Sequence, residues 1–358
     1  MWTKQYNSQN SQQKMRNKIF LPEWTPCDAI LMALPNEETD WNYILTQAWA
    51  QYREIIEKIT RCGIKIVLLC RNVKEAEKVL EGINQNNIFF VETDFNDTWT
   101  RDYGPLTILK HGDLRVLDFG FNAWGLKFAA DKDNLINRTL NRKSVITKGI
   151  YRNESAFILE GGSVDTDGEG TILTTTKCLC SPNRNGGLSK TEATEKLKQH
   201  LGAEHVLMLD YGALIGDDTD SHIDTLARMA PENTIVFTGC RNIEDPQFEE
   251  LLKMRAQLSM FRNIHGEPFN LVELPLPDPV FDDEANRLPA TYANYLVTDR
   301  YLFMPTYNQP DNDRLAMQTI RIPFPDHEII GIDCRALLWQ HGSLHCATMQ
   351  LPKGVLAI

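Results

Sequence analysis

Short apolar runs alternate with amphipathic segments near the start of this 358-residue chain. Residues 29–34 and 64–70 have the length and apolar content of buried strands. Between them, apolar residues recur with helical spacing from Ile44 to Ile59, and Gly63 follows as a stop signal. Strands that alternate with helices predict an α/β protein.

Tight turns join paired apolar runs further along the chain, which predicts β-hairpins at residues 106–119, 163–173 and 295–303. Chemically prominent polar residues recur near such runs at separations of 58, 62, 72 and 52 residues, and they are Asp102, Glu160, His222, Asn294 and Cys346. A repeat of this size favours a repeat or propeller architecture, although the units share no clear sequence identity.

No low-complexity linker divides the chain. Residues 21–358 are therefore expected to form a single domain, and residues 1–20 form a polar lead-in that need not be ordered. The lead-in lacks the apolar stretch of a signal peptide, and no apolar run is long enough for a membrane helix. We expect a cytoplasmic protein.

Acidic residues outnumber basic ones, and the net charge is −11. Binding to phosphates requires a surplus of Lys and Arg, so nucleic acids and anionic membranes are poor partners for this chain. A small cationic substrate is compatible with the charge. No Gly-rich phosphate-binding motif is present either.

Eight cysteines occur, none in a C-x-x-C pair. In a large chain without a secretion signal, free thiols are the expected state. Cys346 differs from the others because Gly342 and Ser343 precede it and leave room for a ligand beside the backbone. It is a candidate nucleophile, with a buried structural cysteine as the alternative.

The segment 216–224 contains five ionisable residues among its last eight positions, including His222 and Asp224. If the segment around His222 is extended, these two side chains face the same side and present a proton carrier beside a carboxylate. A solvated acidic loop and a metal site built from the same carboxylates are the alternatives.

Two further motifs combine charge with aromatic or glycine neighbours. Trp99 and Asp102 together make a cation receptor, since the ring face attracts the cation and the carboxylate accepts its N–H groups. Glu160 is followed by Gly161 and Gly162, which permit close approach of the backbone to another group. A polar turn and a charge at a strand end are the simpler interpretations.

Taken together, these motifs resemble the agmatine deiminase and bacterial peptidyl-arginine deiminase family of guanidino-group-modifying enzymes. The resemblance runs from Glu23-Trp24 to Leu351-Pro352, and its strongest parts are residues 96–105, 159–163, 216–224 and 342–346. It implies a five-bladed pseudo-symmetric α/β propeller with a central active site and neither a metal nor an organic cofactor.

The resemblance also implies a role for each candidate residue. Cys346 would be the nucleophile and His222 the acid and base, with Glu160 orienting His222. Asp102 and Asp224 would grip the guanidinium. Trp99 would line the pocket beside Gly342, and Asn294 would support the site.

Agmatine is the preferred substrate, because an acidic pocket suits its second amine and Asp218 is a candidate partner. Peptidyl-arginine or free arginine is the alternative, since the string before Cys346 departs from the Gly-Gly-Gly-Asn-Ile-His-Cys of agmatine deiminases. A metallohydrolase that uses residues 217–224 and a non-catalytic cation-binding protein are the competing classes. The sequence leaves a homo-oligomer open.

Overall fold

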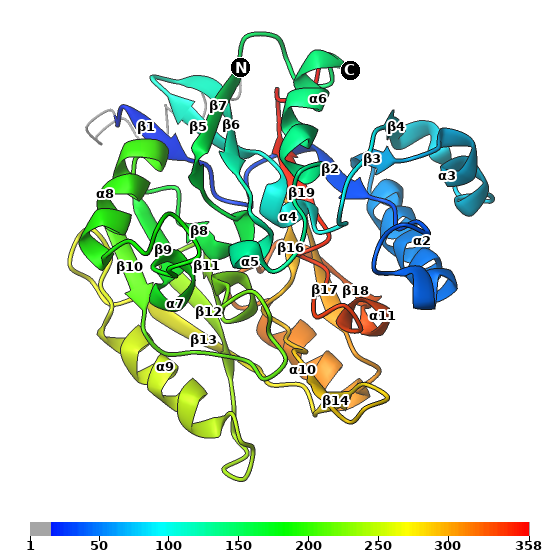
Figure 1. Ribbon diagram of the computed structural model, residues 1–358. Helices are drawn as coiled ribbons and strands as arrows, with labels where there is room; N and C mark the ends of the chain where they lie inside the picture. Colours follow the sequence, from blue (N-terminus) through cyan, green and yellow to red (C-terminus); the bar gives the residue numbers. More distant parts are fainter. Residues whose placement is uncertain (1–15, 358) are drawn as a thin grey trace.

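The computed structural model describes residues 16–357 of the chain. Within this range the protein is mixed α/β and contains six sheets, of which five have three or four strands and the sixth has two. Figure 1 shows the strands lying toward the middle of the molecule, with the longer helices α2, α8, α9 and α10 on the outside.

The strands of the five larger sheets, each sheet in its spatial order, are β1 (Lys18–Phe20), β5 (Leu106–Lys110), β6 (Asp113–Gly120) and β7 (Tyr151–Ile158); β10 (His205–Leu209), β9 (Thr171–Thr175) and β8 (Val164–Thr166); β11 (Ala227–Ala230), β12 (Thr234–Gly239) and β13 (Asn270–Pro275); β16 (Leu296–Val297), β17 (Tyr301–Thr306) and β18 (Glu328–Asp333); and β19 (Met349–Pro352), β2 (Cys27–Ala33), β3 (Lys65–Cys70) and β4 (Ile88–Glu92). The two-stranded sheet consists of β14 (Val280–Phe281) and β15 (Arg287–Leu288).

The five larger sheets share one pattern of three strands. A first strand runs antiparallel to a central strand, and the central strand runs parallel to a third, as in β8, β9 and β10. The same directions hold for the sets that start at β5, β11, β16 and β19. A tight turn suffices for an antiparallel pair, whereas a parallel pair needs a crossover, which the helices provide.

The helices of the structure are α2 (Leu45–Arg61), α3 (Val73–Val79), α4 (Thr100–Tyr103), α5 (Ala123–Leu126), α6 (Ile136–Arg142), α7 (Thr176–Leu179), α8 (Lys190–Leu201), α9 (Phe248–Met260), α10 (Pro310–Thr319) and α11 (Arg335–Leu338). Helix α2 buries one face, with Ala48, Tyr52 and Ile55 fully enclosed. Helix α8 begins with a capping box between Ser189 and Glu192 and ends at Gly202 in the left-handed region.

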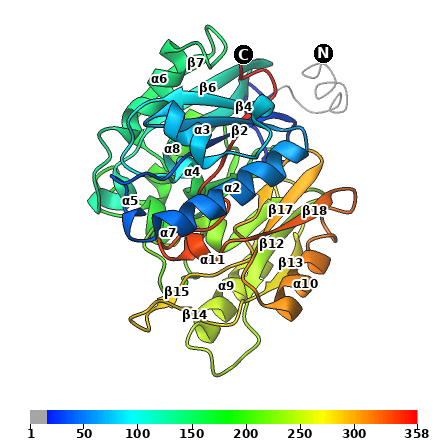
Figure 2. The ribbon, with the colours of Figure 1, turned by 90° about the vertical axis from the view of Figure 1, so that its right-hand side faces the viewer.

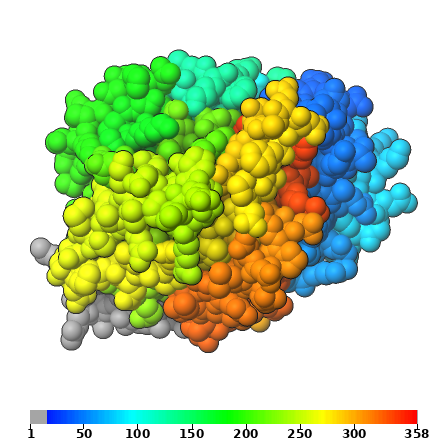
Figure 3. Space-filling view, turned by 90° about the horizontal axis from the view of Figure 1, so that it is seen from below, coloured from blue at the N-terminus to red at the C-terminus, as the bar shows by residue number. Residues whose placement is uncertain are grey.

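The two ends of the described chain meet in one sheet. Strand β19 pairs with β2 in antiparallel register, Met349 opposite Leu31 and Leu351 opposite Ala29. Helix α11 lies against α2, so the C-terminal segments pack on the N-terminal ones (Figure 2). On the face shown in Figure 3, the orange and red C-terminal surface lies directly beside the blue N-terminal surface. The segment before β19, which carries Cys346, is thereby held between distant parts of the sequence.

The structure confirms the α/β class and the three predicted hairpins, which are β5–β6, β8–β9 and β16–β17. The predicted helix after residue 44 is α2. In the described residues, no helix is long and apolar enough to cross a membrane. All eight cysteines are free thiols, as expected.

Two local features differ from the sequence-based expectations. The segment around His222 is not extended, because Ile223–Thr225 forms a 3-10 helix with His222 at its N-cap. Residues 18–20, assigned to the polar lead-in, form β1, since Ile19 and Phe20 pair with Leu109 and Ile108 of β5 at the edge of the sheet. Residues 1–15 of the lead-in lie outside the described range.

Candidate active site

Several of the residues singled out from the sequence line one cavity, and they are Trp99, Asp102, Asp218, Gly342 and Cys346. Its lining combines a buried thiol, several carboxylates and aromatic rings, and the lining residues are Asp40, Asp97, Trp99, Asp102, Trp124, Phe128, Asp218, Thr219, Thr225, Gln340, His341, Gly342 and Cys346. Acidic and aromatic walls around a thiol suit a cation that is to be attacked by sulfur.

The candidate residues occupy the same position in each of the five larger sheets. Each of the five larger sheets begins its three-strand pattern with a short strand, and a candidate residue lies just before that strand. Asp102 precedes β5, Glu160 precedes β8, His222 precedes β11, Asn294 precedes β16 and Cys346 precedes β19. The spacing of about 60 residues seen in the sequence therefore corresponds to the spacing of the sheets.

Gly162 lies where three of these side chains converge. A Cβ atom at this position would lie 2.7 Å from Nδ1 of His222, 2.8 Å from Oδ1 of Asp102 and 2.9 Å from Oδ2 of Asp224. The backbone N–H of Gly162 donates to Asp102 Oδ1 at 2.9 Å. At Gly161 a Cβ atom would collide with the carbonyl oxygen of Arg101. Both glycines are thus required by close approach, as their position beside Glu160 predicted.

Glu160 contacts Nε2 of the His222 ring, the nitrogen opposite to the one that faces Asp102. Its Oε2 lies 2.8 Å from Nε2 of His222, and both side chains are 1% exposed. Arg184 Nε donates to both Glu160 oxygens at 2.9 Å. Burial by itself would raise the pKa of Glu160, but the His222 and Arg184 contacts outweigh it and the pKa is lowered. Glu160 is therefore an ionised carboxylate that fixes the imidazole ring.

The other ring nitrogen of His222, Nδ1, faces Asp102. Nδ1 lies 3.6 Å from Oδ1 of Asp102 and makes no hydrogen bond. Burial alone would lower the pKa of His222, yet the charge of Asp102, the neighbouring Cys178 and the hydrogen bond to Glu160 raise the pKa well above its ordinary value. His222 is thus an imidazolium with a free N–H, suited to give a proton to a bound group.

Asp102 and Asp224 supply the carboxylates. Asp102 accepts from Trp124 Nε1 at 2.8 Å through Oδ2, and burial raises the pKa of Asp102 to about 6 despite the nearby His222. Asp224 accepts from His345 Nδ1 at 2.7 Å through Oδ2, while its buried Oδ1 has no hydrogen-bond partner. Burial opposes ionisation of Asp224, but the contact with His345 lowers its pKa. An unpaired buried carboxylate oxygen is costly and points to a ligand.

Cys346 lies between Asp224 and Asn294. Its Sγ is 3.9 Å from Asp224 Oδ2 and 3.3 Å from Asn294 Nδ2. Asn294 Oδ1 also accepts from the backbone N–H groups of His345 and Cys346. Burial, with Asp224 and Asp102 adding to it, raises the pKa of Cys346 well above its usual value. These surroundings favour the protonated thiol over the thiolate.

The remaining predicted residues line the cavity. Trp99 is 6% exposed and packs on Trp41 with ring centroids 5.6 Å apart. The Trp99 ring lies so close to Gly342 that any Cβ there would collide with it. Asp218 is half-buried in the cavity wall, away from the carboxylates at the bottom. Burial raises the pKa of Asp218, and the neighbouring Asp217 adds to the effect.

The acidic loop before His222 is used to build the backbone. Asp217 accepts from the backbone N–H of Ser221 at 2.7 Å and from the Thr219 hydroxyl at 2.6 Å. Asp220 accepts from Arg184 Nη1 at 2.6 Å. Asp220 and Ser221 both have positive φ, a strained conformation that these contacts hold in place. Because these contacts occupy Asp217 and Asp220, the two carboxylates do not form a shared metal-binding face.

One group of buried side chains has ligand atoms close enough for a metal ion within the described residues, and it consists of Glu160, Cys178 and His222. The arginine contact and the His222 contact already occupy both Glu160 oxygens. A fixed positive charge thus adjoins this group, which opposes a dication.

Comparisons with known proteins agree with this geometry. The model of the Porphyromonas-type peptidyl-arginine deiminase family matches residues 19–352. The chain belongs to this family. Its relatives include a Vibrio parahaemolyticus protein provisionally named an agmatine deiminase, 32% identical over 93% of this chain and 96% of the relative.

Two solved structures of the family show the same likeness. A protein from Porphyromonas gingivalis, provisionally named an arginine deiminase, is 43% identical, with a TM-score of 0.89 over 95% of this chain and 99% of that one. A cysteine-to-serine variant of the agmatine deiminase of C. jejuni with substrate bound is 38% identical, with a TM-score of 0.86 over 94% of this chain and 97% of that one.

Sequence reasoning missed several residues that contact the candidates. Arg184 binds Glu160, Trp124 binds Asp102, and His345 binds Asp224. Cys178 lies 3.6 Å from Glu160 Oε2. Of these residues, only His345 lay in one of the strongest parts of the resemblance, residues 342–346, and the sequence did not indicate its partner.

Replacing Gly162 by Ala tests the convergence of side chains. We expect at least a hundredfold loss of kcat/KM, because the added methyl must displace Asp102, His222 or Asp224. Gly331→Ala is the control, since its Cβ would meet only side-chain atoms of Thr306 and Met317. Equal activity of both variants in an ammonia-release assay would contradict the described geometry.

The protonation of Cys346 should depend on a bound cation. A guanidinium ion between Asp102 and Asp224 offsets the two negative charges that raise the pKa of the thiol, so the pKa should fall. The measurement is the rate of Cys346 alkylation against pH, followed by peptide mass spectrometry, with and without guanidinium. We expect the midpoint to move to lower pH, and an unchanged midpoint would refute the expectation.

Proposed function

We propose that this protein hydrolyses the guanidinium group of agmatine to a urea-type product and ammonia through a covalent bond to Cys346. The observation that carries the proposal is the meeting of an imidazole and two carboxylates around Gly162, with the thiol of Cys346 3.9 Å from Asp224 Oδ2. The substrate-bound agmatine deiminase of C. jejuni among the similar structures supports it.

Binding is the first step. A guanidinium is planar and resonance-stabilised, and two carboxylates can accept its N–H groups while the positive charge is drawn toward them. Asp102 and Asp224 would take these positions, the latter through its free Oδ1. Trp99 and Trp124 would form the walls around the cation.

Attack by sulfur follows. With the cation bound, the Cys346 thiol gives its proton to solvent water, and the thiolate Sγ forms a bond to the guanidinium carbon, giving a neutral tetrahedral adduct. His222 donates the proton on Nδ1 to one nitrogen, and the carbon–nitrogen bond breaks with release of ammonia. A thiouronium remains on Cys346.

Hydrolysis restores the thiol. Neutral His222 removes a proton from a water molecule, which adds to the thiouronium carbon. The carbon–sulfur bond then breaks, the hydroxyl proton of the adduct passes to the departing sulfur, and the urea-type product leaves with the thiol of Cys346 restored. Glu160, held by Arg184, keeps the ring of His222 in one orientation through both halves of the cycle.

Agmatine is favoured by the carboxyl groups that line the cavity. Asp218, Asp97 and Asp40 line it together with Trp99 and His341. A second amine at the far end of the substrate would meet these carboxylates, with Asp218 as its proposed partner. Peptidyl-arginine or free arginine remains the second candidate, which the family's name supports.

We also propose that the described chain is one catalytic domain and that its five larger sheets are the blades of a pseudo-symmetric propeller. The shared strand pattern and the candidate residue before each first strand support this arrangement. A cytoplasmic location is proposed because eight free cysteines suit a reducing compartment.

Ammonia release from agmatine, free arginine and peptidyl-arginine tests the function directly. We expect release from agmatine by the wild type and a loss of at least about a thousandfold in Cys346→Ser, because the nucleophile is removed. Cys62→Ser, which changes a half-buried thiol at the end of α2, should behave as the wild type. No release from any of the three substrates by the wild type would end the proposal.

Asp218→Asn tests the site for the second amine. We expect kcat/KM for agmatine to fall about tenfold, through the loss of one charge pair worth about 1.4 kcal/mol. For butylguanidine, which lacks the amine, kcat/KM should stay within about twofold by the same reasoning. Glu284→Gln, at an exposed position, is the matched control. An equal fall for both substrates would contradict the assignment of Asp218.

A further inference from the structure

His345 lies between two carboxylates. Its Nδ1 is 2.7 Å from Asp224 Oδ2, and its Nε2 is 2.8 Å and 3.0 Å from the two oxygens of Glu23. The imidazole is 1% exposed. It precedes the nucleophile in the chain, yet its ring nitrogens face carboxylates rather than the thiol.

We propose that His345 is a positioning residue that holds Asp224 in the orientation that receives the substrate guanidinium, with Glu23 as the second support. This inference rests on the proposed function and extends it to residues outside the cavity lining. It concerns binding of the cation rather than the bond-making step.

Hydrogen-bond chemistry fixes the ring. An ionised carboxylate only accepts, so both nitrogens of His345 must carry hydrogen for both contacts to form. The ring then bridges Asp224 and Glu23 as a cation and cannot rotate without breaking a charge-assisted bond at each end. Asp224 is held by one oxygen, Oδ2, and its other oxygen, Oδ1, is left without a partner.

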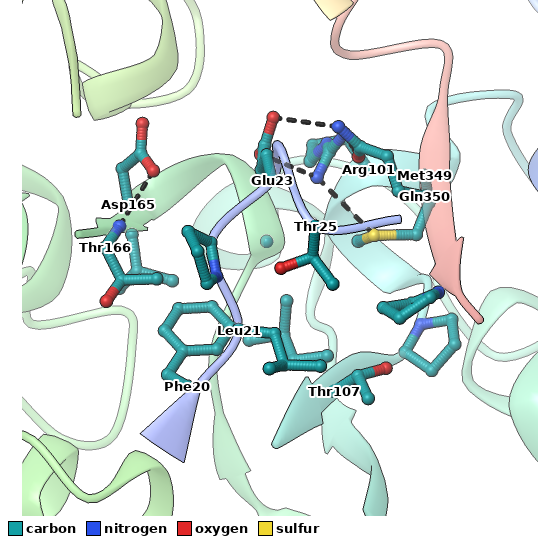
Figure 4. Close-up of a pocket in the computed structure, with 16 residues that line it drawn as sticks. Phe20, Leu21, Glu23, Thr25, Arg101, Thr107, Asp165, Thr166, Met349 and Gln350 are labelled. Carbon is teal, nitrogen blue, oxygen red and sulfur yellow. Dashed lines mark hydrogen bonds and ion pairs between the residues drawn. The ribbon is translucent and has the colours of Figure 1, made fainter. Parts of the chain in front are cut away.

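The second support is itself held firmly. Glu23 contacts His345, Arg101, Arg228 and Gln350. Figure 4 shows Glu23 joined to Arg101, with Met349 and Gln350 beside the guanidinium. Glu23, Arg101, Met349 and Gln350 line a second cavity, distinct from the one that Cys346 lines. Glu23 therefore anchors the imidazole from outside the substrate cavity.

The same residue links Asp224 to the nucleophile. The backbone N–H groups of His345 and Cys346 both donate to Asn294 Oδ1. A shift of the His345 ring would thus disturb the carboxylate, and a shift of its backbone would disturb the thiol. A purely structural ion pair would stabilise the fold without affecting the affinity for the cation, which gives the experiment its discriminating readout.

Two substitutions separate the ring nitrogens. In His345→Asn the amide nitrogen lies near the place of Nδ1 and can still donate to Asp224. In His345→Gln the amide nitrogen lies near the place of Nε2 and keeps only the contact with Glu23. Each variant loses one carboxylate contact. If His345 has only a structural role, both variants should have a lower Tm and an unchanged KM.

We expect KM for agmatine to rise at least about tenfold in His345→Gln, since a hydrogen bond to a charged group is lost, and to stay within about threefold in His345→Asn. Calorimetric binding of agmatine in a Cys346→Ser background should show the same order of affinities. Tyr151→Phe is the matched control, because it removes a hydrogen bond to the buried carboxylate of Asp118, and neither residue lines the cavities of Cys346 and Glu23. It should lower Tm and leave KM unchanged.

The outcomes distinguish the two proposals. Normal turnover by the wild type with equal, wild-type KM values for both His345 variants would overturn the positioning role. Binding of agmatine that weakens in His345→Gln, without ammonia release by the wild type, would overturn the proposed function and support the positioning role. Neither binding nor release would overturn both. If His345→Gln does not fold, Glu23→Gln tests the same contact, and a wild-type KM would refute the inference.

Discussion

Several ionised carboxylates are buried at the centre of this protein, and the rest of the structure supplies a partner for each. Glu160 is paired with Arg184 and His222, while Asp224 is paired with His345. An unpartnered buried charge costs several kcal/mol, so these contacts are conditions for folding as well as for binding a cation. The free oxygen of Asp224 and the free N–H of His222 are exceptions, and both belong to the proposed reaction.

Close packing of these charged groups constrains the backbone around them. Gly161 and Gly162 bring one segment so near to Asp102, His222 and Arg101 that no larger residue fits. Asp220 and Ser221, just before His222, have a left-handed backbone conformation. The contacts of Asp217 and the ion pair between Asp220 and Arg184 hold this conformation in place. Carboxylates that looked like metal ligands in the sequence are thus needed to hold a strained turn that places His222.

Local sequence singled out the candidate residues because each has an unusual neighbourhood. Glycines follow Glu160, Trp99 precedes Asp102, and a small-residue turn precedes Cys346. The partners were not found in this way. Glu23 contacts His345 across 322 residues, and Arg184 contacts Asp220 across a turn of unusual backbone conformation. The 3-10 helix after His222 was missed because short apolar and polar alternation is shared by strands and tight helical turns.

The sequence by itself determined the α/β class, the hairpins and the choice of candidate active-site residues. These features depend on periodicity and on neighbours within a few positions. Only the tertiary structure decided which of them meet. Pairing of β19 with β2 brings the segment of Cys346 to the N-terminal part of the chain, and the sheets place Asp102, His222 and Asp224 around Gly162. The protonation of His222 and Cys346 also depends on that meeting, because burial and neighbouring charges shift a pKa only where the folded chain puts them.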